Sequence, residues 1–326
     1  MYKNKKKLVF YLILMFIPVA HFFVFYVYIN FNSFALAFTS YEKASEGFLV
    51  KSFAGFSNFA KGFEELAKYP YRIKNSLLFT AGNIFLITPL TLLFSFYIYK
   101  KGPCSGFFRV ALYVPQILSE VVIGLIYVKL CNSVIPSFAK QVFGITTMTG
   151  FLENPKTSLY FVFFFNSLFW FGVNMLLYSN TMSAINESII ESCHLDGANR
   201  IQEFWYIVLP MIYPTLITMM VVMVSSTFTE QFRMFTLYSN RGDAIGNIGY
   251  FLYLQVQKSD VWVPQGINYV PYTVLSAIGL MLTAIVLPST LIVKKLLTKY
   301  DVCHIIILAS RVIQKRMRKK IRGVAQ

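Results

Sequence analysis

Polar and ionisable side chains recur at helical spacing inside three strongly apolar stretches of this sequence. Residues three or four positions apart lie on one face of a helix, so each set would form a polar stripe. Ionisable groups are costly within a membrane, and they mark substrate or ion pathways there. Hydrogen bonding between neighbouring helices is the alternative, which Asn and Gln commonly provide. The sets, which predict the lining of a polar cavity, are Gln116 with Glu120; Asn166, Trp170 and Asn174; and Ser226, Glu230 and Arg233.

The remaining reactive residues do not indicate catalysis or metal binding. The three histidines, His21, His194 and His304, are scattered along the chain, whereas an enzyme within the membrane would need acids or histidines gathered near one interface. The four cysteines show no metal-like or disulfide-like spacing, so we interpret them as free thiols. We therefore expect no catalytic residue, metal or cofactor on this chain.

The composition excludes an ordinary soluble protein. The 326 residues are 56% hydrophobic and only 13% charged, whereas soluble domains are about 25% charged. The 33 Phe and 21 Tyr add more apolar surface than a globule of this size can bury. The formal net charge of +16 does not indicate nucleic-acid binding, because the basic residues gather at the ends of apolar segments. We therefore expect a polytopic membrane protein.

Six apolar segments are long enough to span a bilayer, which takes about 20 residues. The first follows four lysines, but it is longer than the apolar part of a signal peptide, so we interpret it as a retained span. The fifth is the weakest, because its second half is polar. The predicted spans are Leu8–Ile29, Ser76–Tyr99, Val110–Leu130, Leu159–Tyr178, Tyr213–Phe232 and Tyr272–Val293. The predicted fold class is an all-α polytopic membrane bundle of six transmembrane helices.

Lysine and arginine predict the orientation of this bundle. With six spans, one side of the membrane carries 18 basic residues and the other carries 12. The positive-inside rule then places both termini in the cytoplasm. The 30–75 segment disagrees mildly, since it would lie outside with six basic residues, among them Arg72 and Lys74 close to a span. We expect short helices or loops in the outside segments 30–75, 131–158 and 233–271.

The loop between the fourth and fifth spans predicts a helix, a turn and a second helix. Ile185, Ile189 and Cys193 recur every four residues and give the first helix an apolar stripe. Gly197 stands where that helix must end, which suits a left-handed C-cap. Asp196 is placed to cap the second helix.

The second helix of this loop continues the same amphipathic pattern. Ile201, Phe204 with Trp205, and Val208 again follow helical spacing, and Pro210 then restarts the chain into the fifth span. On pattern alone, an amphipathic hairpin lying on the membrane surface explains these residues as well.

The spacing within this loop resembles the EAA motif, EAA-x3-G-x9-I-x-LP, of the membrane subunits of ABC importers. Here Glu191-Ser192-Cys193 is followed at the same intervals by Gly197, Ile207 and Leu209-Pro210. The longer run, with Asp196-Gly197-Ala198 and Phe204, resembles the sugar-permease branch that contains the maltose and glycerol-phosphate importers. The resemblance covers roughly residues 8 to 295. One departure is that the two alanines of the motif are Ser192 and Cys193, which match them in size only.

The resemblance implies a permease subunit that moves a sugar or oligosaccharide inward from an extracellular or periplasmic solute-binding protein. It also implies a second permease subunit, giving a heterodimer, and two cytoplasmic ATPase subunits that bind ATP and Mg. This chain has no phosphate-binding loop of its own. The residues implied in coupling to the ATPase are Glu191, Ser192, Cys193, Asp196, Gly197, Ala198, Phe204, Ile207, Leu209 and Pro210. Glu191 and Asp196 would offer anionic contacts, and Trp170 would offer a stacking surface for a sugar ring.

Three regions are expected along the chain. Residues 1–71 would hold the N-terminal tail, the first span and an external segment, residues 72–294 the core of spans two to six, and residues 295–326 a basic cytoplasmic tail. The tail has a basic amphipathic pattern suited to anionic lipid, with a disordered end as the alternative. Alternative functions are a membrane-embedded glycan-modifying enzyme, an ABC permease for a non-sugar solute, and a channel, which would not need an ATPase-docking loop.

Overall fold

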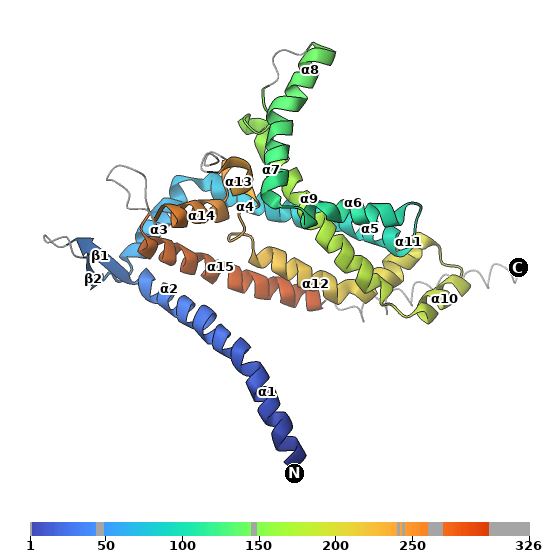
Figure 1. The fold of residues 1–326 in the computed structure, drawn as a ribbon, viewed down its shortest axis with the longest axis horizontal. Helices are drawn as coiled ribbons and strands as arrows, with labels where there is room; N and C mark the ends of the chain where they lie inside the picture. Colours follow the sequence, from blue (N-terminus) through green and yellow to red (C-terminus); the bar gives the residue numbers. More distant parts are fainter. Residues whose placement is uncertain are drawn as a thin grey trace, which may run out of the picture. The chain divides into compact units, whose positions relative to one another are not determined.

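The computed structural model of the protein describes residues 2–43, 49–144, 149–239, 242, 245–259 and 270–299. This part of the chain is helical apart from one two-stranded hairpin, so the all-α fold class is confirmed (Figure 1). The elements, with η for a π-helix, are α1 Tyr2–His21, η1 Phe22–Tyr28, α2 Ile29–Ala37, β1 Thr39–Lys43, β2 Leu49–Phe53, α3 Ser57–Lys68, α4 Pro70–Gly82, η2 Asn83–Ile87, α5 Thr88–Tyr99, α6 Ser105–Ile117, α7 Glu120–Lys129, η3 Leu130–Val134, α8 Ile135–Phe143, α9 Pro155–Ser183, α10 Glu187–Leu195, α11 Arg200–Glu203, η4 Phe204–Val208, α12 Leu209–Ser225, α13 Met234–Tyr238, α14 Ile248–Ser259 and α15 Tyr272–Lys299.

Within the described residues, six helical runs are long and apolar enough to cross a membrane. They agree with the six predicted segments in number and order, and the third and fifth runs differ from the prediction in position. Several join an α-helix to a π-helical turn, the local widening that often marks functional sites. The runs are Val9–Ala37, Pro70–Tyr99, Glu120–Phe143, Pro155–Ser183, Arg200–Ser225 and Tyr272–Lys299.

The chain forms two compact units. One unit contains the described residues up to Pro70 together with 252–285, and the other contains 71–251 with the described residues from 286. The three regions expected from the sequence, 1–71, 72–294 and 295–326, stay a prediction. The predicted amphipathic pattern of the tail falls mainly on residues 300–326, which lie outside the described residues.

The first unit holds a feature that the sequence did not predict. Strands β1 and β2 pair antiparallel, with Thr39 opposite Phe53, in a segment for which we expected short helices or loops. The buried amide of Asn58 donates to the carbonyl oxygens of Ala37 at 2.9 Å and of Thr39 at 2.8 Å. These bonds fix the chain where it leaves α2 and enters the hairpin.

The third predicted span, Val110–Leu130, is wrong as a single helix. Helix α6 ends at Ile117, Leu118 is extended, and α7 begins at Glu120. Pro115 near the end of α6 removes a backbone donor and crowds the preceding turn, which weakens the helix there. The spanning run therefore starts at Glu120 and continues through η3 and α8 to Phe143.

The fifth predicted span, Tyr213–Phe232, is shifted in the structure. The helix runs without interruption from Arg200 through η4 and α12 to Ser225, so Pro210 lies inside it and does not restart it. At its end the hydroxyls of Ser225 and Thr227 donate to carbonyl oxygens within the last turn, at 2.8 Å and 2.9 Å. Such bonds compete with continued helix.

The second unit packs α5, α6 and α9 side by side (Figure 1). Helix α6 approaches α9 at Gly172, where a Cβ atom would lie 2.4 Å from the carbonyl oxygen of Leu112. Only glycine permits this approach. A buried apolar cluster joins the ends of α5 and α9 to α10, η4 and α12, and it consists of Leu92, Tyr178, Met182, Ile190, Phe204, Val208, Ile212 and Leu216.

Candidate functional site

The 186–208 hairpin, which contains α10, α11 and η4, carries the motif found in the sequence. Its first helix begins at Glu187, where the side chain of Asn186 accepts a hydrogen bond of 3.1 Å from the backbone N–H of Ser188. Helix α10 ends at Leu195, and Gly197 follows with φ of +76°. The predicted left-handed cap at Gly197 is confirmed.

Two backbone hydrogen bonds close the turn after α10. The N–H of Gly197 donates to the carbonyl of His194 at 3.0 Å, and the N–H of Ala198 donates to that of Cys193 at 3.2 Å. This pair is the Schellman arrangement, which needs a left-handed residue at the position of Gly197. A Cβ at Gly197 would meet no atom within 4 Å, so the requirement for glycine there comes from the backbone and not from crowding.

The predicted cap of the second helix is wrong. Asn199, and not Asp196, occupies that position: its side chain accepts from the N–H of Gln202 at 2.8 Å, and the Gln202 side chain accepts from the N–H of Asn199 at 2.9 Å. Asp196 instead caps the end of α10 and is exposed. The Asp196 carboxylate therefore does not cap the second helix.

The buried face of the hairpin differs partly from the predicted stripes. Ile190 and Cys193 are buried, whereas Ile189 is exposed. In the second arm, Phe204 and Val208 are buried, while Ile201 and Trp205 are exposed. The π-helical turn of η4 shifts the register of the second arm, because it adds residues to one turn.

The exposed face of the hairpin combines acidic and apolar groups. Glu191, Ser192 and Asp196 face outward, which fits the predicted anionic contacts. Leu195 projects between them and is 88% exposed. An exposed leucine flanked by carboxylates suits a partner surface that has an apolar pocket and basic residues. The sequence prediction missed Leu195, because the motif does not mark that position.

The other motif residues attach the hairpin to the bundle. Phe204 is buried in the apolar cluster, and Ile207 and Leu209 are half-buried against it. Pro210 is buried, and Cys193 is buried on the inner side of α10. Burial raises the pKa of the Cys193 thiol, and the nearby carboxylates of Glu203 and Asp196 raise it further.

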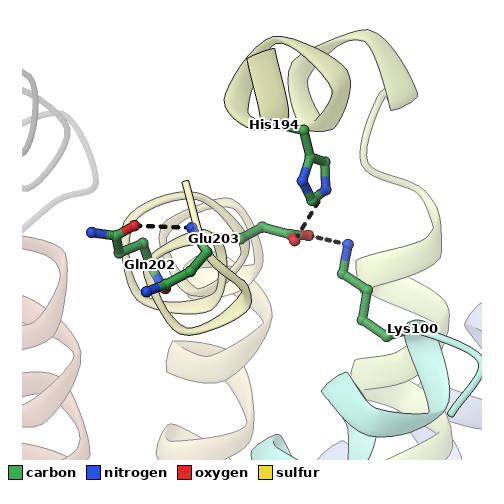
Figure 2. A network of polar contacts seen from close by, with 5 residues as sticks. Lys100, His194, Gln202 and Glu203 are labelled. Carbon is green, nitrogen blue, oxygen red and sulfur yellow. Dashed lines mark hydrogen bonds and ion pairs between the residues drawn. The ribbon is translucent and has the colours of Figure 1, made fainter. Parts of the chain in front are cut away.

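A charged network that the sequence prediction missed lies at the base of the hairpin. The Glu203 carboxylate is completely buried and forms an ion pair with Lys100, from the end of α5. His194 of α10 approaches the same carboxylate, with its Nε2 3.4 Å from Oε2 (Figure 2). Buried carboxylates are rare unless they are paired. The position of Glu203 on the apolar face of its helix could therefore have indicated a buried ion pair.

A second polar group lies between α7, α9 and α13, and we call it the polar cluster. Arg233 donates to the side-chain oxygen of Asn166 at 2.7 Å, and its Nε lies 3.3 Å from the Glu120 carboxylate. Thr236 donates to the other oxygen of Glu120 at 2.7 Å. The guanidinium also lies 4.4 Å from the centre of the Phe169 ring. Arg233 thus contacts both Glu120 and Asn166, two residues of the predicted path.

The other residues of the predicted path do not join the polar cluster. Gln116 is exposed beyond the break in the third span, and Asn174 donates to the carbonyl of Trp170 within α9 at 2.9 Å. Ser226 bonds within its own helical turn, and Glu230 accepts from the N–H of Phe232 at 3.2 Å. The polar stripe predicted over 226–233 is therefore wrong, because the chain is not helical there.

Comparison with known proteins relates these features to one family. Residues 87–301 match the family described as binding-protein-dependent transport system inner membrane component. The arabinooligosaccharides transport system permease protein AraP of Bacillus subtilis is 25% identical over 228 residues, which cover 68% of this chain and 69% of AraP. The sn-glycerol-3-phosphate transport system permease protein UgpA of Rhizobium meliloti is 24% identical over 60% of this chain and 67% of its own length.

A solved structure has the same fold. A chain of a bacterial ABC transporter involved in the import of the acidic polysaccharide alginate superimposes with a TM-score of 0.70 at 20% identity. The match covers 91% of this chain and 98% of that chain. At this identity the similarity describes the fold and not the substrate.

Proposed function

The chain belongs to the family of binding-protein-dependent transport system inner membrane components, and from that premise we propose that it moves an oligosaccharide across the membrane. It is the multi-pass transmembrane permease of an ABC importer and not an enzyme. Its relatives include permeases named for arabinooligosaccharides and for polygalacturonan and rhamnogalacturonan. These names support a saccharide as the substrate class.

The 186–208 hairpin is the observation that supports coupling to an ATPase. It presents Glu191, Leu195 and Asp196 on one exposed face, and the left-handed turn at Gly197 sets the angle between its arms. Its opposite face is joined to α5 through Lys100 and to the apolar cluster through Phe204. A displacement of a cytoplasmic ATPase subunit bound to the exposed face would therefore be transmitted to the helices of the bundle.

The polar cluster supports a path for a hydroxyl-rich solute. The side chain of Glu120 is 40% exposed and can accept hydrogen bonds from sugar hydroxyls. Asn166 is fully buried and accepts a hydrogen bond from Arg233, which also contacts Glu120. Trp170, which is half-buried, follows on the same helix. We propose that Glu120 and Trp170 line the path and that the buried Asn166 holds Arg233 beside Glu120. Gln116, Asn174, Ser226 and Glu230 contribute less, because they are bonded locally or lie apart.

The partners follow from the same proposal. A solute-binding protein delivers the substrate, and the description of the family as binding-protein-dependent supports this partner. A second permease subunit completes the path as a heterodimer, and two ATPase subunits bind and hydrolyse ATP with Mg on the side of the hairpin. That side is the cytoplasm, which also holds both termini, because it carries the larger share of basic residues.

Uptake by cells tests the substrate class. Cells that express the chain with its neighbouring transport genes are compared with cells that lack it, using labelled arabinotriose, maltotriose and trigalacturonate. We expect chain-dependent accumulation of at least one of these saccharides. Chain-dependent uptake of a peptide or an inorganic ion, with no uptake of any saccharide, would contradict the proposal.

A further inference from the structure

The ion pair between Lys100 and Glu203 joins the end of α5 to the base of the second arm of the hairpin. Lys100 caps α5, with its N–H donating to the carbonyl of Phe96 at 2.9 Å, so it marks the end of the second spanning run. Glu203 is the last residue of α11, at the base of the second arm of the hairpin. A contact between them therefore links the hairpin directly to that run.

Apolar groups enclose this contact. The Lys100 ammonium lies 5.1 Å from the ring centre of Tyr99 and 5.9 Å from that of Phe96. The ring of Phe96 in turn packs on Phe204, with 5.0 Å between centres. Water is excluded from Glu203, so the attraction is weakly screened, and separation would leave a buried charge without a counter-charge.

His194 extends the link to the first arm of the hairpin. It stands near the end of α10 and approaches Oε2 of Glu203, whereas Lys100 approaches Oε1 (Figure 2). One carboxylate therefore contacts α5 and both arms of the hairpin at once. The motif residues on the exposed face take no part in this network, which leaves them available to a partner.

We propose that Lys100, Glu203 and His194 are positioning residues that make the hairpin and the end of α5 move as one rigid body. The proposal rests on the function proposed above, because the displacement to be transmitted is the one that an ATPase imposes on the hairpin. The energetic cost of separating the buried charges makes α5 follow the hairpin. The network is thus a physical connection from the docking surface to the second spanning run.

Distance measurement between two spin labels tests this rigidity. Cysteines introduced at Leu93 on α5 and at Glu187 on α10, both exposed and outside the docking face, carry the labels in a background without the native cysteines. In the purified chain we expect one narrow distance distribution. Lys100→Met should broaden it, Glu203→Gln should broaden it without removing side-chain volume, and Lys100→Arg should keep it narrow. His194→Gln should have a smaller effect.

A second measurement uses the complex with the ATPase subunits. Between the nucleotide-free state and the state trapped with ATP and vanadate, the native distance should stay the same, whereas in Lys100→Met it should shift. An equally narrow distribution in Lys100→Met and Glu203→Gln, or a native distance that changes between states, would overturn the proposal. If no ATPase subunit co-purifies with the native chain, the proposed function fails, while the measurement on the purified chain still decides whether the network is rigid.

Discussion

The guanidinium of Arg233 lies 2.7 Å from the side-chain oxygen of Asn166, 67 residues earlier in the sequence. Its Nε also lies 3.3 Å from Glu120, so one side chain connects α9 and α7 from the loop that precedes α13. A charge at this depth is stable only with such partners. The contact makes the polar cluster the centre of the proposed path.

Glu120→Gln should reduce transport more than Glu230→Gln. Glu120 faces Arg233 and Thr236, whereas the Glu230 side chain accepts from a backbone N–H two residues away. We expect about a tenfold loss of uptake for Glu120→Gln, the factor that corresponds to about 1.4 kcal/mol, with the chain still inserted. Initial uptake rates and membrane levels of the two variants check this. Equal rates for both variants and the native chain would exclude Glu120 from the path.

Gly197→Val should abolish transport while leaving the spans inserted. Valine at a φ of +76° costs about 1–2 kcal/mol in the backbone, so the two hydrogen bonds that close the turn would be lost. Gly197→Asn is the matched control, because asparagine tolerates this conformation and the site has open space. Uptake and ATPase co-purification should fall in Gly197→Val and be largely kept in Gly197→Asn. Native uptake in the valine variant would mean that the turn does not position the hairpin.

Gly172→Ala should destabilise the second unit. The added methyl group would meet the Leu112 carbonyl oxygen at 2.4 Å, and overpacking of this kind costs about 1–3 kcal/mol. Gly279→Ala on α15 is the control, since a Cβ there meets nothing within 4 Å. Thermal unfolding in detergent should show a lower midpoint for the first variant only. Equal midpoints would show that α6 and α9 are not so closely packed.

Thiol labelling tests the orientation, and it requires a choice between the cysteines. Cys104 is exposed, so a membrane-impermeant maleimide should miss it in intact cells and label it in inverted vesicles. Labelling from outside intact cells would reverse the predicted topology. Cys193 is a poor reporter, because it is only 6% exposed and burial raises its pKa.

The raised pKa of Cys193 gives its labelling a defined pH dependence. Because the thiolate is the reactive form, a higher pKa leaves a smaller reactive fraction at neutral pH. The labelling rate of Cys193 should therefore reach half its maximum at a higher pH than that of glutathione in the same buffer. A half-maximum at the same or a lower pH would contradict the buried placement of this side chain.

The sequence alone predicted those features that depend on local pattern. Apolar length predicted the number and order of the six spans, and the position of Gly197 after an amphipathic run predicted its left-handed turn. The second cap was mistaken, because Asp196 and Asn199 are both good capping residues, and the choice depends on where the turn ends. The break after Ile117 was missed, although Pro115 precedes it and the polar pair Ser119-Glu120 follows it, because Gln116 and Glu120 were assigned to one face of a continuous helix.

Contacts between distant parts of the chain could not be predicted in this way. Nothing near Lys100 in the sequence indicates Glu203 as its partner, because the pairing depends on how α5 and the hairpin pack. Arg233 was assigned to a helical stripe with Ser226 and Glu230, but the helix ends at Ser225 and a left-handed turn redirects the side chain. Helical spacing therefore fails wherever the helix itself ends.

Cross-linking from Leu195 tests most directly whether the 186–208 hairpin docks on an ATPase. A photo-reactive benzoylphenylalanine replaces Leu195, which is 88% exposed on the hairpin, and in a control replaces Lys140, which is exposed on α8. After illumination of membranes that contain the co-expressed transporter genes, we predict an adduct between the chain and the ATPase subunit for position 195 and none for position 140. Adducts with lipid but not with the ATPase at position 195 would contradict the account, because the hairpin would then lie on the membrane surface.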